Sequence, residues 1–404
     1  MAEKGMTSFF EDYLKQVPLF NDKKVLQANY NPNHILHRED ELKKIMQILA
    51  PSLRLEKPSN IFIYGKTGTG KTLSIKHVCG ELQKVADKNN TAIKIIYLNC
   101  KMKKIADTEY RLIAELARQF NIEVPATGLP TDEVYNIFIR EIDKSKILLI
   151  IILDEIDQLV QKAGQLLYSM TRINPELKNS EVSLIGISND LMFTNSLDPR
   201  VKSSLSEEEI LFAPYNAMQL YAILEERAKI AFRGDAIAEG VLNKCAAYAA
   251  REHGDARRAL ELLRVAGEIT ERKNMTVITT ENLDEADEKI EKDKLDDFIR
   301  TQPKHGQVAL YTIFKLCMGN NDNEKPIVTG DVYELYKDVC LKLRMKPLTQ
   351  RRVSDIIAEH DMQGIINAKV ISHGRYGRTR QICLGIPPSN APKLAGLLKE
   401  VLGI

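Results

Sequence analysis

The sequence predicts an α/β fold built on a parallel sheet, followed by an all-helical segment and a small basic unit with a helix–hairpin pattern. Four apolar, β-branched runs alternate with helical stretches in the first half of the chain, as in a parallel sheet covered by helices on both faces. Helical patterns then follow one another, and two strand-like runs come late in the chain. At 404 residues the chain is long enough for two or three domains.

The expected elements follow in chain order. Residues 1–35 predict an extended arm with one short helix, and residues 37–50 place apolar side chains at helical spacing. The strand candidates are Ile61–Tyr64, Ile93–Leu98, Ile147–Leu153 and Val182–Ile187. Helices fill the stretch from Pro214 to about Asp297, apart from a short strand candidate at 277–279, and three more precede a hairpin at 364–372 and 379–384. We therefore expect domains at 1–213, 214–300 and 301–404.

The composition argues against a membrane, secreted or disulfide-rich protein. The longest apolar run spans seven residues, whereas a membrane helix needs about 20, so we expect no membrane segment and no signal peptide. Six scattered cysteines argue against a disulfide or zinc framework and favour a reducing cytosol. Residues 300–404 carry 16 Lys and Arg against 9 Asp and Glu, although the whole chain has a net charge of only +2. This basic end favours contact with a polyanion.

A glycine-rich segment lies between the first strand candidate and the helical run 73–85. It reads Gly65, Lys66, Thr67, Gly68, Thr69, Gly70, Lys71, Thr72, which matches the P-loop pattern. Glycines let backbone N–H groups wrap a phosphate, and the helix N-terminus adds positive charge. Lys71 should reach the β- and γ-phosphates and Thr72 should bind Mg²⁺, so the segment predicts ATP/ADP with Mg²⁺. The alternative is a chance glycine-rich turn.

Two carboxylates end the apolar run 147–153. Asp154 is expected in the magnesium shell, and Glu155 is expected to orient and polarise the attacking water. A buried strand followed by a solvated acidic turn is the alternative reading.

Together these motifs resemble those of AAA+ ATPases, and further parts of that pattern occur in order. Asn189 lies at the sensor-1 position, where the family holds the catalytic water, and Arg257 lies at the sensor-2 position, where it contacts the γ-phosphate. Arg258, one step on, is expected to point elsewhere, at the surface or at an interface. The family's finger arginine aligns with Ser204, which leaves Arg200 and Lys202 as the nearby cations. This departure predicts slow turnover or a charge from a partner, with Arg200 in a local ion pair as an equal alternative.

The basic end predicts a winged helix-turn-helix. Thr349 can cap a helix that buries residues 353, 356 and 357, and the opposite face carries Gln350, Arg351 and Ser354 near base edges. Arg352 could reach either a base or a phosphate. The hairpin that follows carries Arg375, Tyr376, Arg378 and Arg380, suited to backbone or minor-groove contact. The alternative is a small packing domain with a solvated basic loop.

The order of these motifs closely resembles that of the archaeal replication initiators, single-chain relatives of the origin recognition complex and the cell-division-cycle helicase loader. The resemblance runs from about residue 18 to 390 and includes the segments 31–39 and 197–204 and the insertion 108–132. In the family this insertion touches DNA, which implies contacts from Thr127, Gly128 and Leu129. The implied function is recognition of double-stranded origin DNA under control of ATP binding and slow hydrolysis. The implied partners are the replicative helicase and paralogous initiators, in the cytoplasm at the nucleoid and away from membranes. Rival readings are a signal-transducing P-loop ATPase, a clamp-loader subunit, and a transcription regulator with a vestigial ATP site.

Overall fold

The computed structural model forms two compact units, Met1–Ala286 and Asp287–Ile404, which we describe separately. It describes residues 10–11, 17–32, 34–101, 109–122, 124–125, 129–159, 164–193, 197–319, 326–372, 378–386 and 391–404. Within these ranges no helix is long and apolar enough to cross a membrane.

The first unit is organised by a five-stranded sheet, with all neighbouring strands parallel, in the order β2-β3-β4-β1-β5. The strands are β1 (Ile61–Gly65), β2 (Ile93–Asn99), β3 (Leu148–Asp154), β4 (Glu181–Ser188) and β5 (Glu208–Phe212). The four predicted strands are confirmed to within a residue at each end. Strand β5 was not predicted. Three of its five residues are exposed at the sheet edge, so its sequence lacks the apolar run that marks the others.

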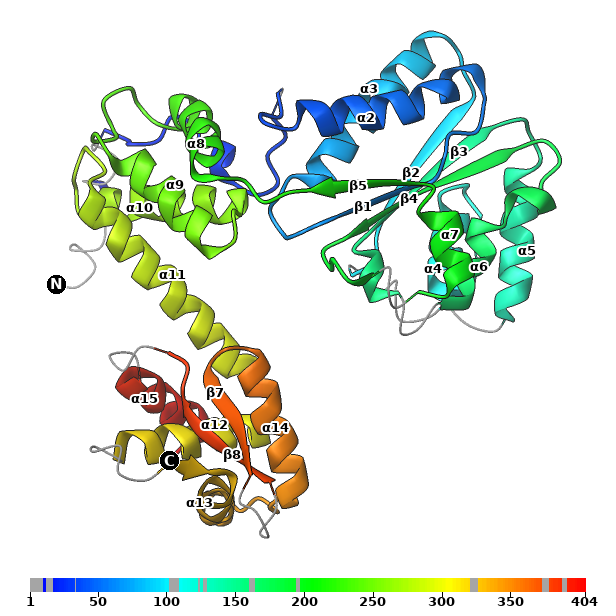
Figure 1. The fold of residues 1–404 in the computed structure, drawn as a ribbon. Coiled ribbons are helices and arrows are strands. Elements are labelled where there is room, and N and C mark those ends of the chain that lie inside the picture. Colours follow the sequence, from blue (N-terminus) through cyan, green and yellow to red (C-terminus); the bar gives the residue numbers. More distant parts are fainter. Residues whose placement is uncertain are drawn as a thin grey trace. The chain divides into compact units, whose positions relative to one another are not determined.

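Helices cover both faces of this sheet (Figure 1). They are α2 (Glu39–Leu49), α3 (Lys71–Lys88), α4 (Glu109–Arg118), α5 (Thr131–Ile142), α6 (Gly164–Thr171) and α7 (Pro199–Leu205). Alternate residues of each buried strand point to opposite faces. Ile150 packs in the cluster with α2 and α3, whereas Leu149 and Ile151 pack in the cluster with α4 to α7. Strands buried on both faces explain the continuous apolar runs in the sequence.

The carboxyl ends of β1, β3 and β4 meet along one edge of the sheet. Strand β1 ends at Gly65, β3 at Asp154 and β4 at Ser188. In open parallel sheets this edge is where ligands bind, since side chains from successive loops converge there. The fold therefore brings the predicted glycine-rich, acidic and polar motifs to the same place.

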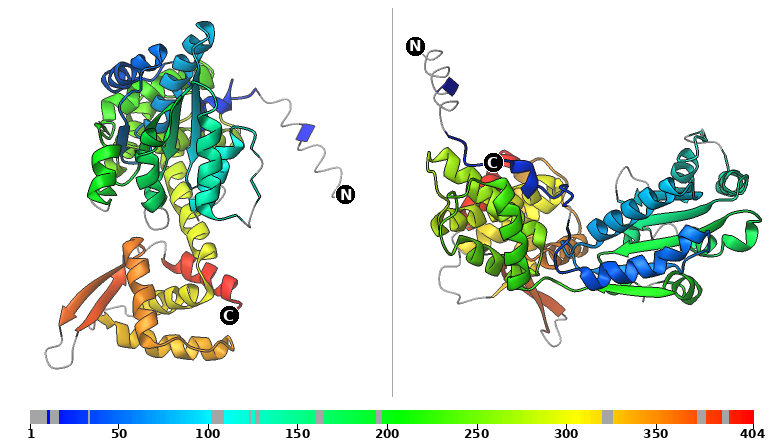
Figure 2. Two further views of the ribbon diagram at one scale, coloured as in Figure 1. Left: turned by 90° about the vertical axis from the view of Figure 1, so that its right-hand side faces the viewer. Right: turned by 90° about the horizontal axis from the view of Figure 1, so that it is seen from above.

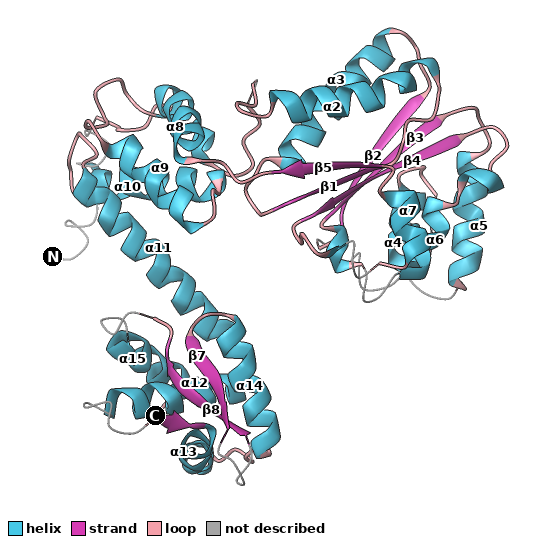
Figure 3. Ribbon diagram, in the orientation of Figure 1, coloured by secondary structure: helices cyan, strands magenta, loops and turns pink. Residues whose placement is uncertain are grey.

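Three helices, α8 (Ala217–Ala231), α9 (Val241–Glu252) and α10 (Ala256–Arg272), pack against one another and form what we call the lid. Figure 3 shows the lid as helices without strands, and the predicted strand at 277–279 is only a single bridge, Ile237 to Ile278. The part of the N-terminal arm at residues 17–32 lies along the lid (Figure 2), with a 3-10 helix at Lys23–Leu26 and a bridge from Phe20 to Phe232. Helix α11 (Thr280–Thr301) follows and spans the boundary between the units.

The second unit packs helices around a small antiparallel sheet in the order β6-β8-β7. Its elements are α12 (Lys304–Gly319), β6 (Ile327–Val328), α13 (Thr329–Lys342), α14 (Gln350–Met362), β7 (Ile366–Ser372), β8 (Arg378–Leu384) and α15 (Ala391–Leu402). The predicted winged helix-turn-helix is confirmed, with β7 and β8 forming its hairpin. Strand β6, two residues long, and α15 were not predicted. The apolar face of α14, with Val353, Ile356 and Ile357, is buried in the core as expected.

Candidate nucleotide and nucleic-acid sites

The glycine-rich loop wraps the N-terminus of α3, an 18-residue helix. Gly68 and Gly70 have φ angles of +73° and +92°, values that side chains with a Cβ rarely adopt. A Cβ at Gly68 would also lie 1.6 Å from Oδ1 of Asp255 on the lid. Thr69 is fully buried, and its Oγ1 donates to the carbonyl oxygen of Lys66 at 2.8 Å. The loop therefore presents backbone N–H groups and a helix N-terminus, the features that bind phosphate.

Lys71 is held inside this loop. Its side chain is buried, and its ammonium donates to the backbone carbonyls of Gly65 at 2.8 Å and Lys66 at 2.7 Å. Burial lowers the pKa of Lys71 to about 8, against the opposing pull of Asp154. Among the described residues, the hydrogen bonds of this buried cation go to neutral carbonyls, which suits it to an anionic ligand, so the loop fits the phosphates of a nucleotide.

Asp154 and Thr72 meet as a magnesium site requires. The Thr72 hydroxyl donates to Oδ2 of Asp154 at 2.9 Å. Tyr97, on the neighbouring strand β2, donates its phenol O–H to the same oxygen at 2.6 Å. Hydroxyl and carboxylate oxygens are the ligands that Mg²⁺ prefers. The residues therefore fit the ion, and Tyr97 is a positioning residue that the sequence analysis missed.

Glu155 has a φ angle of +55°, which is uncommon for a residue other than glycine and is often found where a site constrains the backbone. Its Oε1 accepts from Nδ2 of Asn99 at 3.5 Å, and Nζ of Lys101 lies 3.9 Å from Oε2. Asn189 lies directly after β4, and its backbone N–H donates to Oδ1 of Asp157 at 3.3 Å. Glu155 and Asn189 both line one cavity with Lys71, Thr72 and Asp154.

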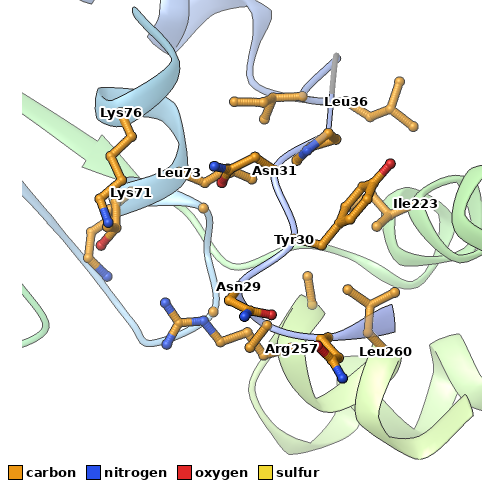
Figure 4. Close-up of a pocket in the computed structure, with 18 of the residues that line it drawn as sticks. Asn29, Tyr30, Asn31, Leu36, Lys71, Leu73, Lys76, Ile223, Arg257 and Leu260 are labelled. Atoms are coloured by element: carbon orange, nitrogen blue, oxygen red, sulfur yellow. The ribbon is translucent and has the colours of Figure 1, made fainter. Parts of the chain in front are cut away.

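This cavity has a volume of about 410 Å³, within the range usual for small-molecule sites. Arg257 enters it from α10 and extends toward the glycine-rich loop (Figure 4). Asp255 caps α10 by accepting from the Arg257 N–H at 2.7 Å, and the N–H of Ala256 donates to the Gly68 carbonyl at 3.2 Å. The lid is thus fixed to the phosphate loop at the residue before Arg257. The expected surface position of Arg258 was wrong, because its side chain is buried and pairs with Glu252 at 3.0 Å.

Arg38 is a further residue that sequence reasoning missed. Its guanidinium is buried, donates to the Thr69 carbonyl at 3.0 Å and pairs with Glu41 at 2.9 Å. It also lies 4.0 Å above the ring of Tyr215, at the start of the lid. No local pattern marks this role, because all its partners except Glu41 are distant in sequence.

The region expected to hold a finger arginine shows a local arrangement. Arg200 donates two hydrogen bonds of 3.1 Å to Asp198, and its guanidinium lies 5.0 Å above the ring of Tyr168. The ion pair that the sequence left as an alternative is therefore present. Lys202 and Ser204 lie on α7 with it.

The predicted DNA-contacting residues of the second unit lie at the start of α14. The Thr349 hydroxyl accepts from the Arg352 N–H at 3.4 Å and caps the helix, as predicted. Gln350, Arg351 and Arg352 are exposed and Ser354 is half-buried. Asp355 lies 3.8 Å from Arg352, a separation that leaves the guanidinium open to other partners.

The remaining predicted contacts are described only in part. Arg380 is half-buried in β8, where its backbone N–H donates to Thr329 at 3.4 Å. Leu129 is half-buried and packs against the core of the first unit. The other predicted residues, Thr127, Gly128, Arg375, Tyr376 and the side chain of Arg378, lie outside the described residues.

Three family models match the chain in sequence. They are an AAA domain at residues 54–192, the "Cdc6 AAA+ ATPase-type lid domain" at 221–288, and the "CDC6, C terminal winged helix domain" at 297–392. The chain is 51% identical over 393 residues to the "ORC1-type DNA replication protein" of Thermococcus onnurineus, covering 96% of this chain and 93% of that one. The namesake protein of Pyrococcus horikoshii is 51% identical over 388 residues, covering 95% and 91%.

The solved structure of the Aeropyrum pernix ORC1 protein in complex with DNA superposes with a TM-score of 0.84 at 43% identity, covering 95% of this chain and 98% of that one. Cdc6p from Pyrobaculum aerophilum, 22% identical with a TM-score of 0.60, shares the fold, with coverages of 95% and 99%.

Proposed function

The chain belongs to the family of ORC1-type DNA replication proteins, and on that premise we propose that it is a nucleotide-controlled switch that binds origin DNA. It is a replication initiator with an AAA+ ATPase domain. The observation that carries the switch is the pocket itself, where Lys71 of the core and Arg257 of the lid line one cavity.

ATP is the proposed ligand of this pocket. The glycine-rich loop and Lys71 bind the phosphates, and Arg257 donates to the outermost phosphate from the lid. Mg²⁺, held by Thr72 and Asp154, would neutralise charge on the phosphate oxygens. Glu155 accepts a proton from the attacking water, and Asn189 orients that water. Because the Ala256 N–H bonds to the Gly68 carbonyl, we expect a nucleotide in the loop to act on the start of α10 through this bond.

We propose that the chain hydrolyses ATP slowly, as suits a nucleotide that acts as a conformational switch. A finger arginine supplied by a neighbouring subunit is worth roughly 10³–10⁵ in rate. Arg200 is engaged by Asp198 within the chain and would have to exchange that carboxylate for a phosphate. Turnover by the protein alone should therefore fall well below the roughly 1–100 s⁻¹ of kinases.

DNA is the proposed partner of the winged unit. Support comes from its basic charge, from the exposed side chains at the start of α14, and from the DNA complex of the A. pernix relative. Gln350, Arg351 and Arg352 would face base edges, because the N-terminal end of a recognition helix enters the major groove. The contacts of Thr127–Leu129 and of the hairpin tip stay proposals, as do recruitment of the replicative helicase and sharing of the origin with paralogous initiators.

The test uses the full chain and duplexes from its own chromosome. Arg351→Ala should weaken binding to the preferred duplex by about 1–3 kcal/mol and relax sequence preference. A matched control, Arg272→Ala, removes an exposed arginine of the lid and should change neither affinity nor preference. If Arg351→Ala leaves the preferred and scrambled duplexes bound as by the parent, α14 does not read DNA sequence.

A further inference from the structure

A buried arginine on α8 has no role in the phosphate site described above. Arg227 is 8% exposed and lines the nucleotide cavity. Among the residues that the structure describes, its Nη1 has no hydrogen-bond partner. Burial lowers the pKa of Arg227, which shows that its charge is held in a poorly solvated place. A buried guanidinium with an unused donor costs free energy, and a ligand acceptor would remove that cost.

The partner that Arg227 does have leaves this donor available. Tyr30, on the N-terminal arm, lies with its ring 4.5 Å from the guanidinium carbon. This is a cation–π contact between the guanidinium and the ring. It leaves the Nη1 donor without a hydrogen-bond acceptor among the described residues, so that donor is available to a ligand.

The position of this pair identifies the part of the ligand it meets. Lys71 and Arg257 mark the phosphate end of the cavity. Leu260 lies one turn beyond Arg257 on α10, and Ile223 lies one turn before Arg227 on α8, so each pair shares a helix face. Figure 4 shows Tyr30 beside Ile223, on the side of the pocket away from Lys71.

Ile35, Ile223 and Leu260 give the cavity an apolar section, and Tyr30 and Ile223 lie at the end of the cavity away from Lys71. A flat aromatic base fits an apolar section of this kind, whereas phosphate and ribose need polar partners. The Tyr30–Arg227 pair therefore lies at the end of the cavity where a base would bind.

We propose that Arg227 donates a hydrogen bond from Nη1 to a ring nitrogen of the adenine base, and that with Tyr30 it holds the base in the pocket. The inference rests on the proposed nucleotide function and deepens it. Adenine ring nitrogens are acceptors, which suits a guanidinium that can only donate. A site built to bond such a group discriminates against ligands that lack it, because the buried donor is then left unpaired.

The experiment compares ATP with tripolyphosphate, which carries phosphates but no base. In the full chain with Mg²⁺, Arg227→Met should raise the Kd for ATP by roughly 10- to 100-fold, the loss of one charged hydrogen bond. The Kd for tripolyphosphate should change less than about twofold. Lys229→Met is the matched control, since Lys229 is an exposed cation on the same helix. It should leave both constants unchanged.

Deaza analogues of ATP, each lacking one ring nitrogen, test the bond directly. One analogue should bind the parent roughly tenfold more weakly than ATP, and Arg227→Met should show no further loss with it. Arg227→Lys, which keeps the charge but loses the planar stack, gives a second variant if thermal unfolding shows that the methionine variant is misfolded.

Three results would overturn the inference. They are equal losses of ATP and tripolyphosphate affinity, unchanged ATP affinity in a folded variant, and additive effects of variant and every analogue. A parent chain that binds no triphosphate would instead overturn the proposed function as well, so the two failures are distinguishable.

Discussion

Replacing Lys71 by methionine should abolish nucleotide binding and yet stabilise the nucleotide-free protein. The ammonium is buried, and its pKa falls from the ordinary 10.5 to about 8 because burial disfavours the charge. This corresponds to about 3 kcal/mol against the charged form at neutral pH. Methionine has similar length and carries no charge. The carbonyls of Gly65 and Lys66 lose their donor, at about 1 kcal/mol each, so the net gain should be about 1–3 kcal/mol.

The stability difference between the parent and the Lys71→Met variant should depend on pH. At pH 7 Lys71 is protonated in the native and unfolded states, so the penalty is fully present in the parent. As pH rises from 8 to 10.5, the native state releases the proton first and the penalty is relieved. The stability advantage of the methionine variant should therefore shrink over this interval.

The assay is thermal unfolding followed by far-ultraviolet circular dichroism, since the chain has no tryptophan. Without nucleotide, Lys71→Met should unfold a few degrees above the parent at pH 7. ATP with Mg²⁺ should raise the midpoint of the parent but not that of the variant. Lys84→Met, which removes an exposed lysine on α3 away from the loop, should change neither property. A variant that is less stable than the parent at pH 7 would refute the reasoning.

Three further outcomes are expected. Glu155→Gln should retain bound ATP and slow its hydrolysis by at least about 10²-fold, measured as phosphate release; a parental rate would remove Glu155 from the mechanism. Tyr97→Phe deletes the hydroxyl that holds Asp154, so ATP binding should need roughly 10-fold more Mg²⁺, with nucleotide binding in Mg²⁺-free buffer unchanged. Burial lowers the pKa of His360 in the native state. As pH falls below about 6.5, His360 therefore takes up a proton more readily in the unfolded state than in the native state. The winged unit should therefore lose stability in acid, and His360→Phe should flatten this dependence in urea unfolding at pH 7 and 5.

The strands that the sequence revealed are those with two buried faces. Strand β3 is buried at every position, and its seven apolar or acidic residues are unmistakable as a run. Strand β5 reads Glu-Glu-Ile-Leu-Phe and lies at the edge with three exposed residues, so it carries only a partial apolar signal. Its place beside β1 follows from pairing with a distant strand, which no local pattern encodes.

Residues of the candidate site likewise differ in whether a local sequence pattern marks them. The sequence predicts the candidate binding residues that belong to short motifs, such as Lys71 and Asp154, because glycines and strand ends mark them. Tyr97 and Arg38 were missed because their partners are distant in sequence and come from other elements. Arg227 likewise looks like an ordinary helix residue until α8 is folded against the arm.

The contacts of Arg38 indicate that the nucleotide-binding unit includes residues that precede β1. Its guanidinium joins a residue upstream of the sheet to the phosphate loop at Thr69 and to the chain leaving β5 at Ala213 and Tyr215. The arm before it also supplies Tyr30 to the cavity wall. A truncation starting at β1 would keep every recognisable motif of the ATPase. It would nevertheless lack Tyr30 from the cavity wall and the Arg38 contacts that join the glycine-rich loop to the start of the lid.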